Sequence, residues 1–370
     1  MWRVLRPDAI TVWHNPEVRK RLSWYYEVMS DRKPAKFLIC KRMPCEISLD
    51  DSDLDELWDE HKRLSEEFDK LWELIRYKGK DLSSIGDIPK VNFLDLKIEI
   101  AKRLLRSCCF CEHRCGVDRL KGQRGFCRLD YRTVVHSWFH HYGEEGPLVP
   151  SGTIFYGGCN FRCVFCQNYD ISQENIYGGI EVNPRQLAII QKELRKEGAR
   201  NINHVGGEPT PNLHTILESL RYLEVNVPQL WNSNMYCSEE TMSLLREIID
   251  IWLPDFKYGN DKCALRLSGV KRYVEVVTRN LRIAYECGDM IIRHLVLPNH
   301  IDCCTAPILK WISENTPGAL VNIMGQYRPE YLVERYPDKW PDIARRLYSD
   351  ELRKAFDLGR KYNLCFEPIS

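Results

Sequence analysis

From about residue 152 to the end of the chain, short apolar runs alternate with segments whose apolar residues recur at helical spacing. This alternation is typical of parallel βα units, in which each buried strand is followed by a helix that covers the sheet. The pattern therefore predicts an α/β fold with six such units. The predicted strands are residues 153–156, 201–205, 230–232, 251–256, 290–297 and 320–324, with a last short strand at 364–367.

Helical patterns are clearest at three places. Apolar residues recur at helical spacing from Leu54 onward, and Asp53 precedes them as a candidate N-cap. A second, shorter helix is expected over residues 93–105, directly before a segment rich in cysteine. Later in the chain, Asn183 stands as a cap in front of a helix that begins at Pro184.

The overall composition excludes several classes of protein. The chain has 370 residues, with 53 Lys and Arg against 52 Asp and Glu, which gives a formal net charge of +1. This balance disfavours nucleic acid or another polyanion as a partner. Hydrophobic residues make up 44% and charged residues 28% of the chain, as in ordinary globular proteins, which disfavours disordered and fibrous classes.

The chain contains sixteen cysteines, and their meaning depends on the compartment. Arg3, Arg6 and Asp8 interrupt the amino end, and no run of 18 apolar residues occurs in the sequence. Neither a signal peptide nor a membrane span is therefore predicted, and the expected location is the cytoplasm. Clustered cysteines in a cytoplasmic protein point to metal binding rather than to disulfides.

The strongest chemical signal is the segment GGCNFRCVFCQN, which directly follows the first predicted strand. Its Cys159, Cys163 and Cys166 have C-x3-C-x2-C spacing. Three thiolates on one tight loop can hold three irons of a [4Fe-4S] cluster and leave the fourth iron open to an outside ligand. A structural zinc site prefers four protein ligands and no open position. The number of cysteines, three, therefore disfavours the two alternatives, which are a zinc site and incidental thiols.

This loop resembles the signature of the radical S-adenosylmethionine (SAM) superfamily. The resemblance implies that the open iron binds the amino and carboxylate groups of SAM. It also implies that an electron from the reduced cluster cleaves the sulfonium and yields a 5′-deoxyadenosyl radical, which abstracts hydrogen from a substrate. An electron donor of the ferredoxin or flavodoxin type is implied as a partner, together with a small-molecule or protein substrate.

The resemblance also implies a fold, a partial (βα)6 TIM-like barrel of the radical SAM type with a helical, cysteine-rich N-terminal extension. We accordingly divide the chain into three parts. These are a helical N-terminal extension (1–95), a cysteine-rich auxiliary metal or iron–sulfur segment (96–150) and a radical SAM partial barrel (151–370).

Further segments extend the resemblance to the ends of later strands. In NINHVGGEPTP, Gly206, Gly207 and Glu208 match the turn whose backbone binds the amino group of SAM in this superfamily. Glycines suit that task because backbone carbonyls must reach an ammonium group without a Cβ in the way.

Three more segments, LWNSNMY, LPDFKYGN and IIRHLVLPN, resemble the corresponding parts of glycyl-radical-enzyme activating enzymes. By this resemblance, Asn232 and Asn234 line the ribose and carboxylate side of SAM. Asp255, Lys257 and Arg293 contact it directly or through an ion.

Other polar residues near the strand ends have two interpretations each. His294 is either a hydrogen-bonded core histidine or a functional group, and in the first case Arg293 faces the cavity. Asn322, Gln326, Tyr327 and Arg328 are candidate substrate contacts, with a hydrogen-bonded loop as the alternative.

A second cysteine group precedes the barrel. Cys108, Cys111, Cys115 and Cys127 have C-x2-C-x3-C-x11-C spacing, and four ligands make a closed site. Residues 97–132 carry ten basic and four acidic side chains, which favours an anionic second [4Fe-4S] cluster, with zinc as the alternative. Binding of RNA by the basic run is disfavoured because aromatic side chains are not interleaved with it.

The segment CCFCEHRCGVDRLKGQRGFC resembles the branch of proteins that are like the pyruvate formate-lyase activating enzyme. Our principal hypothesis is a radical SAM enzyme of oxidoreductase or lyase type that abstracts hydrogen from an unidentified substrate. The alternatives are an activating enzyme that installs a glycyl radical on a partner protein, and an iron–sulfur electron-transfer module. Cys303 and Cys304 could donate hydrogen, form a covalent bond, bind a further metal or simply be buried in the core.

Overall fold

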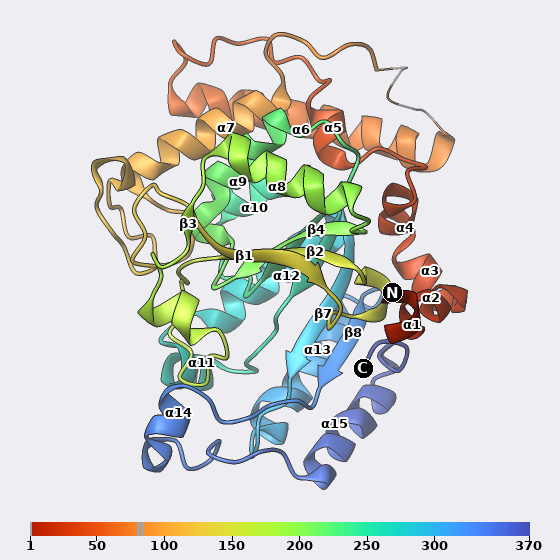
Figure 1. Cartoon of the computed structure of the whole chain (residues 1–370), viewed down its shortest axis with the longest axis vertical. Coiled ribbons are helices and arrows are strands. Elements are labelled where there is room, and N and C mark those ends of the chain that lie inside the picture. The colour runs from red at the N-terminus through yellow and green to blue at the C-terminus, as the bar shows by residue number, and fades with distance from the viewer. Residues whose placement is uncertain (1, 80–81, 83–84) are drawn as a thin grey trace.

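The computed structural model describes residues 2–79, 82 and 85–370, and a single mixed sheet forms its centre (Figure 1). The strand order is β3-β1-β2-β4-β5-β6-β7-β8, and neighbouring strands from β2 to β8 pair in parallel. The strands are β1 (Val134–His141), β2 (Ser151–Tyr156), β3 (Ile180–Glu181), β4 (Asn201–Gly206), β5 (Gln229–Ser233), β6 (Ile251–Pro254), β7 (Asp289–Leu295) and β8 (Leu320–Met324). The six predicted parallel strands and the α/β class, consistent with a partial TIM-like barrel, are confirmed.

The strands β1 and β3 were not predicted, and one predicted strand is absent. β1 pairs antiparallel with β2, and β3 pairs antiparallel with β1, at one edge of the sheet. The sequence of β1, VVHSWFHH, shows no clean alternation, because Trp138 and Phe139 are adjacent and both partly exposed. The strand expected at 364–367 is wrong: only Cys365 pairs, with Leu320, because the chain turns back on itself from Phe366 onward.

Helices that alternate with the parallel strands cover the outside of the sheet. Asn183 caps α8 as predicted, since its side chain accepts a hydrogen bond from the backbone N–H of Gln186. The helices from β3 to the end of the chain are α8 (Pro184–Lys196), α9 (Leu213–Tyr222), α10 (Glu239–Leu245), α11 (Asp261–Ser268), α12 (Tyr273–Cys287), α13 (Ala306–Asn315), α14 (Leu332–Arg335) and α15 (Ser349–Lys361), of which α14 and α15 follow the last strand.

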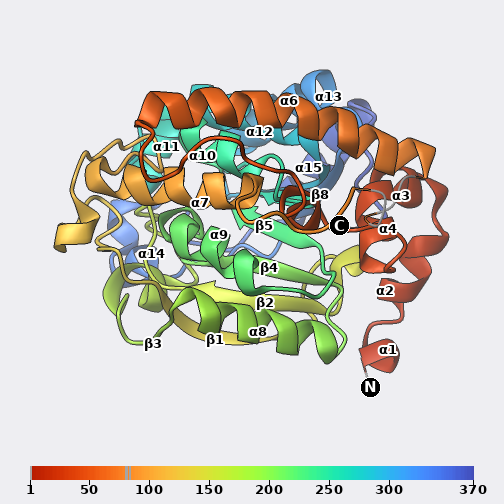
Figure 2. The same cartoon turned by 90° about the horizontal axis from the view of Figure 1, so that it is seen from above.

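The N-terminal extension is helical, as expected, but it contains more helices than the pattern predicted. Asp53 caps the long helix α6 in a capping box with Glu56, and α7 matches the second predicted helix. Helix α7 lies beside α9 on the outside of the barrel, and α6 lies beside α7 (Figure 2). The extension comprises α1 (Trp2–Leu5), α2 (Asp8–Thr11), α3 (Pro16–Arg21), α4 (Ser23–Met29), α5 (Lys36–Cys40), α6 (Leu54–Lys78) and α7 (Phe93–Leu104). Across the described residues, no helix combines the length and apolar character that a membrane crossing needs.

Helix α4 closes the amino end of the parallel strands. The indole Nε1 of Trp24 donates to Asp250 at 2.9 Å, and the backbone N–H of Tyr25 donates to Asp289 at 2.8 Å. The Tyr25 hydroxyl accepts a hydrogen bond from Asn201 at 2.9 Å. Because these three partners stand at the beginnings of β6, β7 and β4, the extension blocks this end of the barrel and leaves the carboxyl end for the site.

Candidate active site

The carboxyl ends of the parallel strands surround a cavity of about 740 Å³. Active sites of α/β barrels lie at this end because the loops that follow the strands converge there. The cavity wall includes all the residues expected to bind the radical cluster and SAM. They are Cys159, Cys163, Cys166, Gly206, Gly207, Glu208, Asn232, Asn234, Asp255, Lys257 and Arg293. Side chains and backbone from five separate segments of sequence thus meet at one place.

The loop after β2 presents its three thiols to this cavity. The backbone N–H of Phe161 donates to the sulfur of Cys159 at 3.3 Å. The sulfur of Cys163 lies 2.9 Å from the Ser268 hydroxyl.

The electrostatics of this loop also fit a cluster. Burial raises the pKa of the Cys163 thiol to about 11, although the Lys257 ammonium opposes that rise. Such a thiol needs a bound cation to stay ionised, and iron supplies that charge. The buried thiols, with backbone N–H groups directed at sulfur, therefore fit a [4Fe-4S] cluster.

Gly206 and Gly207 let the turn after β4 lie directly against the cysteine loop. Gly206 has a φ of +115°, and a Cβ there would overlap the backbone of Tyr156. A Cβ on Gly207 would overlap the carbonyl oxygen of Gly158. Any other residue at either position would separate the two loops, so the glycines are required by the packing itself.

Glu208 connects this turn to the neighbouring strand. Its carboxylate accepts hydrogen bonds from the hydroxyls of Thr210 and Ser233, both at 2.6 Å, and from the backbone N–H of Asn234 at 3.0 Å. Burial raises the pKa of Glu208, and the three donors favour its ionised form. Its acceptor positions are used within the chain, so its contribution is to fix the turn and Asn234. Ser233 was not identified from the sequence.

An ionic cluster stands at the ends of β6 and β7. The Lys257 ammonium lies 2.8 Å from Asp255, and Arg293 Nε donates to the same carboxylate at 2.9 Å. Burial alone would raise the pKa of Asp255, but the two cations outweigh it and hold the pKa below its ordinary value. Arg293 also donates to Asn232. The three charged groups carry one net positive charge, which suits an anionic group of a ligand.

The floor of the cavity is formed by Glu144 and Glu145, which the sequence analysis missed. Glu144 accepts from Asn203 at 3.0 Å and lies 3.6 Å from the Arg293 guanidinium. Burial and the neighbouring Glu145 raise the pKa of Glu144 to about 7. Glu145 accepts from Asn322 at 2.8 Å. The pair follows β1, so the signal was hidden by the failure to predict that strand.

The remaining predicted residues divide into two groups. Asn322 and Gln326 line the cavity. The hydroxyl of Tyr327 donates to a backbone carbonyl in the core, and Arg328 forms an ion pair with a nearby glutamate, so neither lines the cavity. Both ring nitrogens of the buried His294 have hydrogen-bond partners, which supports the core interpretation.

The second cysteine group lies in the loops that precede β1. Burial raises the pKa of Cys111, and the neighbouring Cys127, Cys108 and Cys115 raise it further, so the four thiols are close enough to interact. No three of these four described thiols lie within 4.8 Å of one another. The Arg119 guanidinium lies 3.9 Å from the sulfur of Cys108, which provides a positive charge beside the group.

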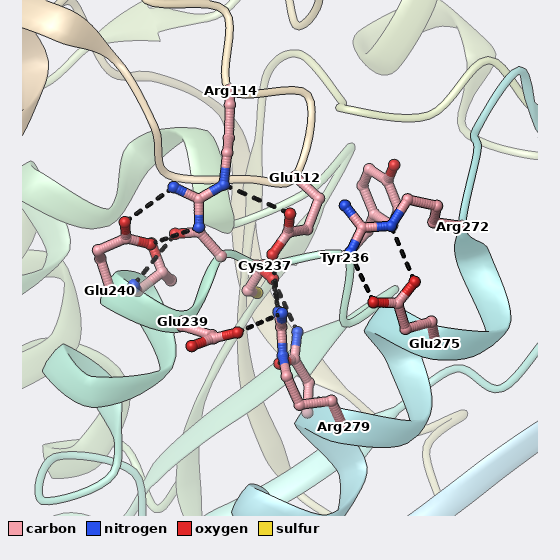
Figure 3. Close-up of polar contacts among 12 residues, drawn as sticks. Glu112, Arg114, Tyr236, Cys237, Glu239, Glu240, Arg272, Glu275 and Arg279 are labelled. Atoms are coloured by element: carbon pink, nitrogen blue, oxygen red, sulfur yellow. Dashed lines mark hydrogen bonds and ion pairs between the residues drawn. The ribbon is translucent and has the colours of Figure 1, made fainter.

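An ion-pair network attaches this cysteine-rich segment to the barrel (Figure 3). The two terminal guanidinium nitrogens of Arg114 donate to the two carboxylate oxygens of Glu240, at the start of α10, at 2.8 and 2.9 Å. Arg279 of α12 lies 2.8 Å from Glu112 and 2.9 Å from Glu239. Bidentate contacts of this kind fix orientation as well as position.

The two cysteine groups are next to each other. The rings of His113 and Phe126 are stacked, with their centroids 3.8 Å apart. Nε2 of His113 lies 2.9 Å from the carbonyl oxygen of Asn160, in the loop that carries Cys159, Cys163 and Cys166. Arg162 donates to the carbonyl of Phe126. Both Cys159 and Cys127 act electrostatically on Arg162, so this guanidinium lies between the two groups.

Comparison with known proteins agrees with this geometry. Residues 153–312 match the model of the Radical SAM superfamily. The chain therefore contains a radical SAM domain. The matched range begins in β2 and contains the cysteine loop, the glycine turn and the ionic cluster. A radical SAM domain implies SAM and a [4Fe-4S] cluster as cofactors.

Two relatives come from Methanocaldococcus jannaschii. The uncharacterized protein MJ0674 is 46% identical over 351 residues, which cover 93% of this chain and 98% of the relative, so the two belong to one family. The uncharacterized protein MJ0808 is 23% identical over 282 residues, covering 68% of this chain and 80% of the relative.

Two solved structures are also similar to part of the radical SAM chain. Streptococcus suis SuiB bound to precursor peptide SuiA has a TM-score of 0.40 at 16% identity, and the match covers 56% of this chain but 46% of SuiB. TYW1 with a lysine-pyruvate adduct has a TM-score of 0.34 at 16% identity, covering 56% of this chain and 73% of TYW1.

Proposed function

We propose that this chain is an enzyme that cleaves SAM reductively at a [4Fe-4S] cluster held by Cys159, Cys163 and Cys166. The resulting 5′-deoxyadenosyl radical would abstract hydrogen from a substrate in the same cavity. The observation that carries the proposal is that the three thiols, the glycine turn and the ionic cluster all line one cavity. An electron-transfer module would need the thiols but not a cavity with these binding groups.

The residues around the cavity have separate tasks in this proposal. When bound, the cluster supplies the electron that breaks the sulfonium bond of SAM. The backbone of Gly206 and Gly207, which lines the cavity, would bind the ammonium group of SAM. Lys257 and Arg293 attract its carboxylate, and their shared Asp255 keeps both cations in place.

Two asparagines complete the proposed SAM site. Asn234 is fixed from both sides, since its Nδ2 donates to Asn160 at 2.7 Å and its backbone N–H donates to Glu208. Asn232 is held by Arg293. Side chains that are fixed before the ligand arrives lose little entropy when it binds, so these two amides are suited to recognise the ribose and the carboxylate side.

The second cysteine group is proposed to hold a second iron–sulfur cluster that passes electrons to the first. Cys108, Cys111, Cys115 and Cys127 interact electrostatically, and the Arg119 guanidinium beside Cys108 favours an anionic cluster, with zinc as the alternative. His113 and Arg162 join the two groups, and a donor of the ferredoxin or flavodoxin type in the cytoplasm would supply the electrons.

The substrate would occupy the deeper part of the cavity, next to Glu144, Glu145, Asn322 and Gln326. One carboxyl oxygen of Glu145 is buried without a hydrogen-bond partner among the described residues. Such a group favours a ligand that donates hydrogen bonds, for example an amine or amide. A small molecule or a peptide segment would fit this description.

Glycyl-radical activation is the second candidate function, and the resemblance of the segments around Asn232, Asp255 and Arg293 to activating enzymes favours it. A loop of the partner enzyme would then enter the cavity and present a glycine α-hydrogen. An activating enzyme requires a glycyl radical enzyme to act on. The two candidate functions are therefore distinguished by whether the genome of the source organism encodes such an enzyme.

The proposed function is tested by anaerobic reconstitution with iron and sulfide, reduction, addition of SAM and measurement of 5′-deoxyadenosine. We expect the wild-type protein to form it and Cys163→Ala to form none. Cys365→Ser is the matched control, because this thiol lies outside both cysteine groups, and it should behave as wild type. Absence of 5′-deoxyadenosine from a wild-type protein with a full cluster would contradict the proposal.

A further inference from the structure

A third group of metal-binding side chains lies outside the cavity. Cys263 comes from α11, His300 from the loop after β7, and Cys303 and Cys304 from the π-helical turn Ile301–Thr305. Their three sulfurs and one ring nitrogen all lie within 4.8 Å of one another. In the described part of the chain this is the only such convergence of His, Cys, Asp and Glu, and none of the four residues lines the active-site cavity.

The distances within this group match a tetrahedral metal site. Nδ1 of His300 lies 3.3 Å from the sulfur of Cys303, 3.6 Å from that of Cys263 and 3.7 Å from that of Cys304. The sulfurs of Cys303 and Cys304 are 3.9 Å apart. Zinc bond lengths give about 3.8 Å between sulfurs and about 3.5 Å between sulfur and nitrogen on the edges of a tetrahedron.

The orientation of the imidazole is fixed from its other side. Nε2 of His300 lies 3.0 Å from a carboxylate oxygen of Asp342, and Arg266 holds that carboxylate through a 3.0 Å contact. A histidine that donates Nε2–H to a carboxylate directs the lone pair of Nδ1 the opposite way, toward the three sulfurs. Metal-binding histidines are oriented in this manner in most zinc sites.

Access to the group is one-sided. Cys263, His300 and Cys304 are buried, whereas Cys303 is exposed. The side-chain amide of Asn260 donates to the carbonyl of Cys303 at 2.8 Å, which holds the turn against α11. A metal ion could therefore enter beside Cys303 and then be enclosed by all four ligands.

We propose that Cys263, His300, Cys303 and Cys304 bind one divalent zinc-class ion in a closed Cys3His site. Four protein ligands leave no open position, so the role would be structural rather than catalytic. The proposal does not rest on SAM chemistry, because its ligands are separate from both cysteine groups described above.

The position of α11 gives this site a consequence for the active site. Cys263 lies near the start of the helix, and Ser268 at its end contacts the sulfur of Cys163. The backbone N–H groups of Arg162 and Val164 donate to the carbonyls of Ser268 and Leu267, both at 2.9 Å. An ion at one end of α11 would therefore help to hold the cysteine loop at the other end.

Metal analysis of anaerobically purified protein tests the proposal, with Cys303→Ser as the variant because its side chain is exposed and its replacement is least disruptive to folding. We expect Cys303→Ser to contain about one zinc per chain fewer than wild type and the same amount of iron. Cys365→Ser should retain the wild-type content of both metals. Equal zinc in wild type and Cys303→Ser would overturn the proposal.

Zinc-edge X-ray absorption of the wild-type protein gives a second test that needs no substitution. The expected spectrum contains sulfur scattering together with imidazole scattering around zinc. An imidazole contribution separates this site from a zinc ion bound by the four cysteines before β1. Absence of zinc after purification in zinc-supplemented medium, or zinc without an imidazole ligand, would overturn the proposal.

Discussion

The two ends of the parallel strands carry buried charges that are used differently. At the amino end, Asp250 accepts hydrogen bonds from the Trp24 indole, from the backbone N–H of Lys36 and from that of Gln229, at 2.9, 3.1 and 2.9 Å. At the carboxyl end, the ionic cluster formed by Asp255, Lys257 and Arg293 borders an open cavity. Charges satisfied within the chain stabilise the fold, whereas charges that face a cavity can bind a ligand.

This difference shows what the N-terminal extension contributes. Its helices cover the beginnings of the strands and supply the donors that the buried carboxylates there require. Burial raises the pKa of both Asp250 and Asp289 to about 6, although hydrogen bonds and nearby cations oppose the rise. Substitutions at the amino end should therefore reduce stability, and substitutions at the carboxyl end should reduce function.

The largest effect on activity is expected from a substitution in the cysteine loop after β2. Cys159→Ala should abolish formation of 5′-deoxyadenosine because the cluster loses a ligand, while the free energy of unfolding of the metal-free protein changes by no more than about 1 kcal/mol. The measurements are product analysis under reducing conditions and urea unfolding of the metal-free protein. If Cys159→Ala still formed 5′-deoxyadenosine, the functional role assigned to the carboxyl end of the strands would be wrong.

A stability loss without a binding defect is expected at the amino end. Asp250→Ala leaves three buried N–H donors unpaired, so it should lower the free energy of unfolding by about 3–5 kcal/mol. Affinity of the folded variant for SAM should stay within twofold of wild type, as calorimetry would show. The exposed Asp338 provides the control, and Asp338→Ala should change neither quantity. A variant as stable as wild type would refute the assigned role of Asp250.

A binding defect is expected from the ionic cluster. Lys257→Met removes a cation beside Asp255 and should weaken SAM binding by about 10- to 100-fold, the range for loss of a charge-assisted contact. Calorimetry under anaerobic conditions measures the dissociation constant. Lys310→Met is the control, because that lysine is exposed and does not line the cavity. Equal affinities for SAM in both variants would exclude Lys257 from the site.

The smallest effect concerns the floor of the cavity. The pKa of Glu144 is raised from 4.5 to about 7, so the folded protein holds this proton more tightly than the unfolded chain. Its contribution to stability is therefore present below about pH 4.5 and is lost as the pH rises through 7. Glu144→Gln cannot lose a proton, and its stability relative to wild type should increase by about 1–2 kcal/mol between pH 5 and pH 8.

Urea unfolding of both proteins across this range measures the effect of Glu144→Gln. A constant difference in the free energy of unfolding between wild type and variant would show that Glu144 titrates normally. Glu144 would then titrate like an exposed glutamate, and the proposed difference between the buried floor of the cavity and the protein surface would be wrong.

The sequence predicted the elements whose signals are local. Asn183 and Asp53 cap helices through contacts with residues three positions away, and the three radical-loop cysteines are neighbours in sequence. Residues that depend on long-range pairing were missed. β1 is stabilised by its antiparallel partner β2, so neither β1 nor the glutamates that follow it could be recognised from periodicity.

The Cys3His group shows the same limit. Cys263 and His300 are separated by a helix and a strand, and only the packing of α11 against the turn after β7 brings them together. From the sequence alone, Cys303 and Cys304 had several interpretations, of which metal binding was one. Spatial convergence of four ligands, which no spacing rule expresses, distinguishes a metal site from buried thiols.

The most direct test of the central claim is electron paramagnetic resonance of the reduced protein with and without SAM. A Cys108→Ser/Cys111→Ser variant would be used, so that only the radical-loop cluster contributes. If three cysteines leave one iron open at the cavity, addition of SAM should change the signal, and Lys257→Met should require more SAM for the same change. A cluster signal that saturating SAM leaves unaltered would contradict the account.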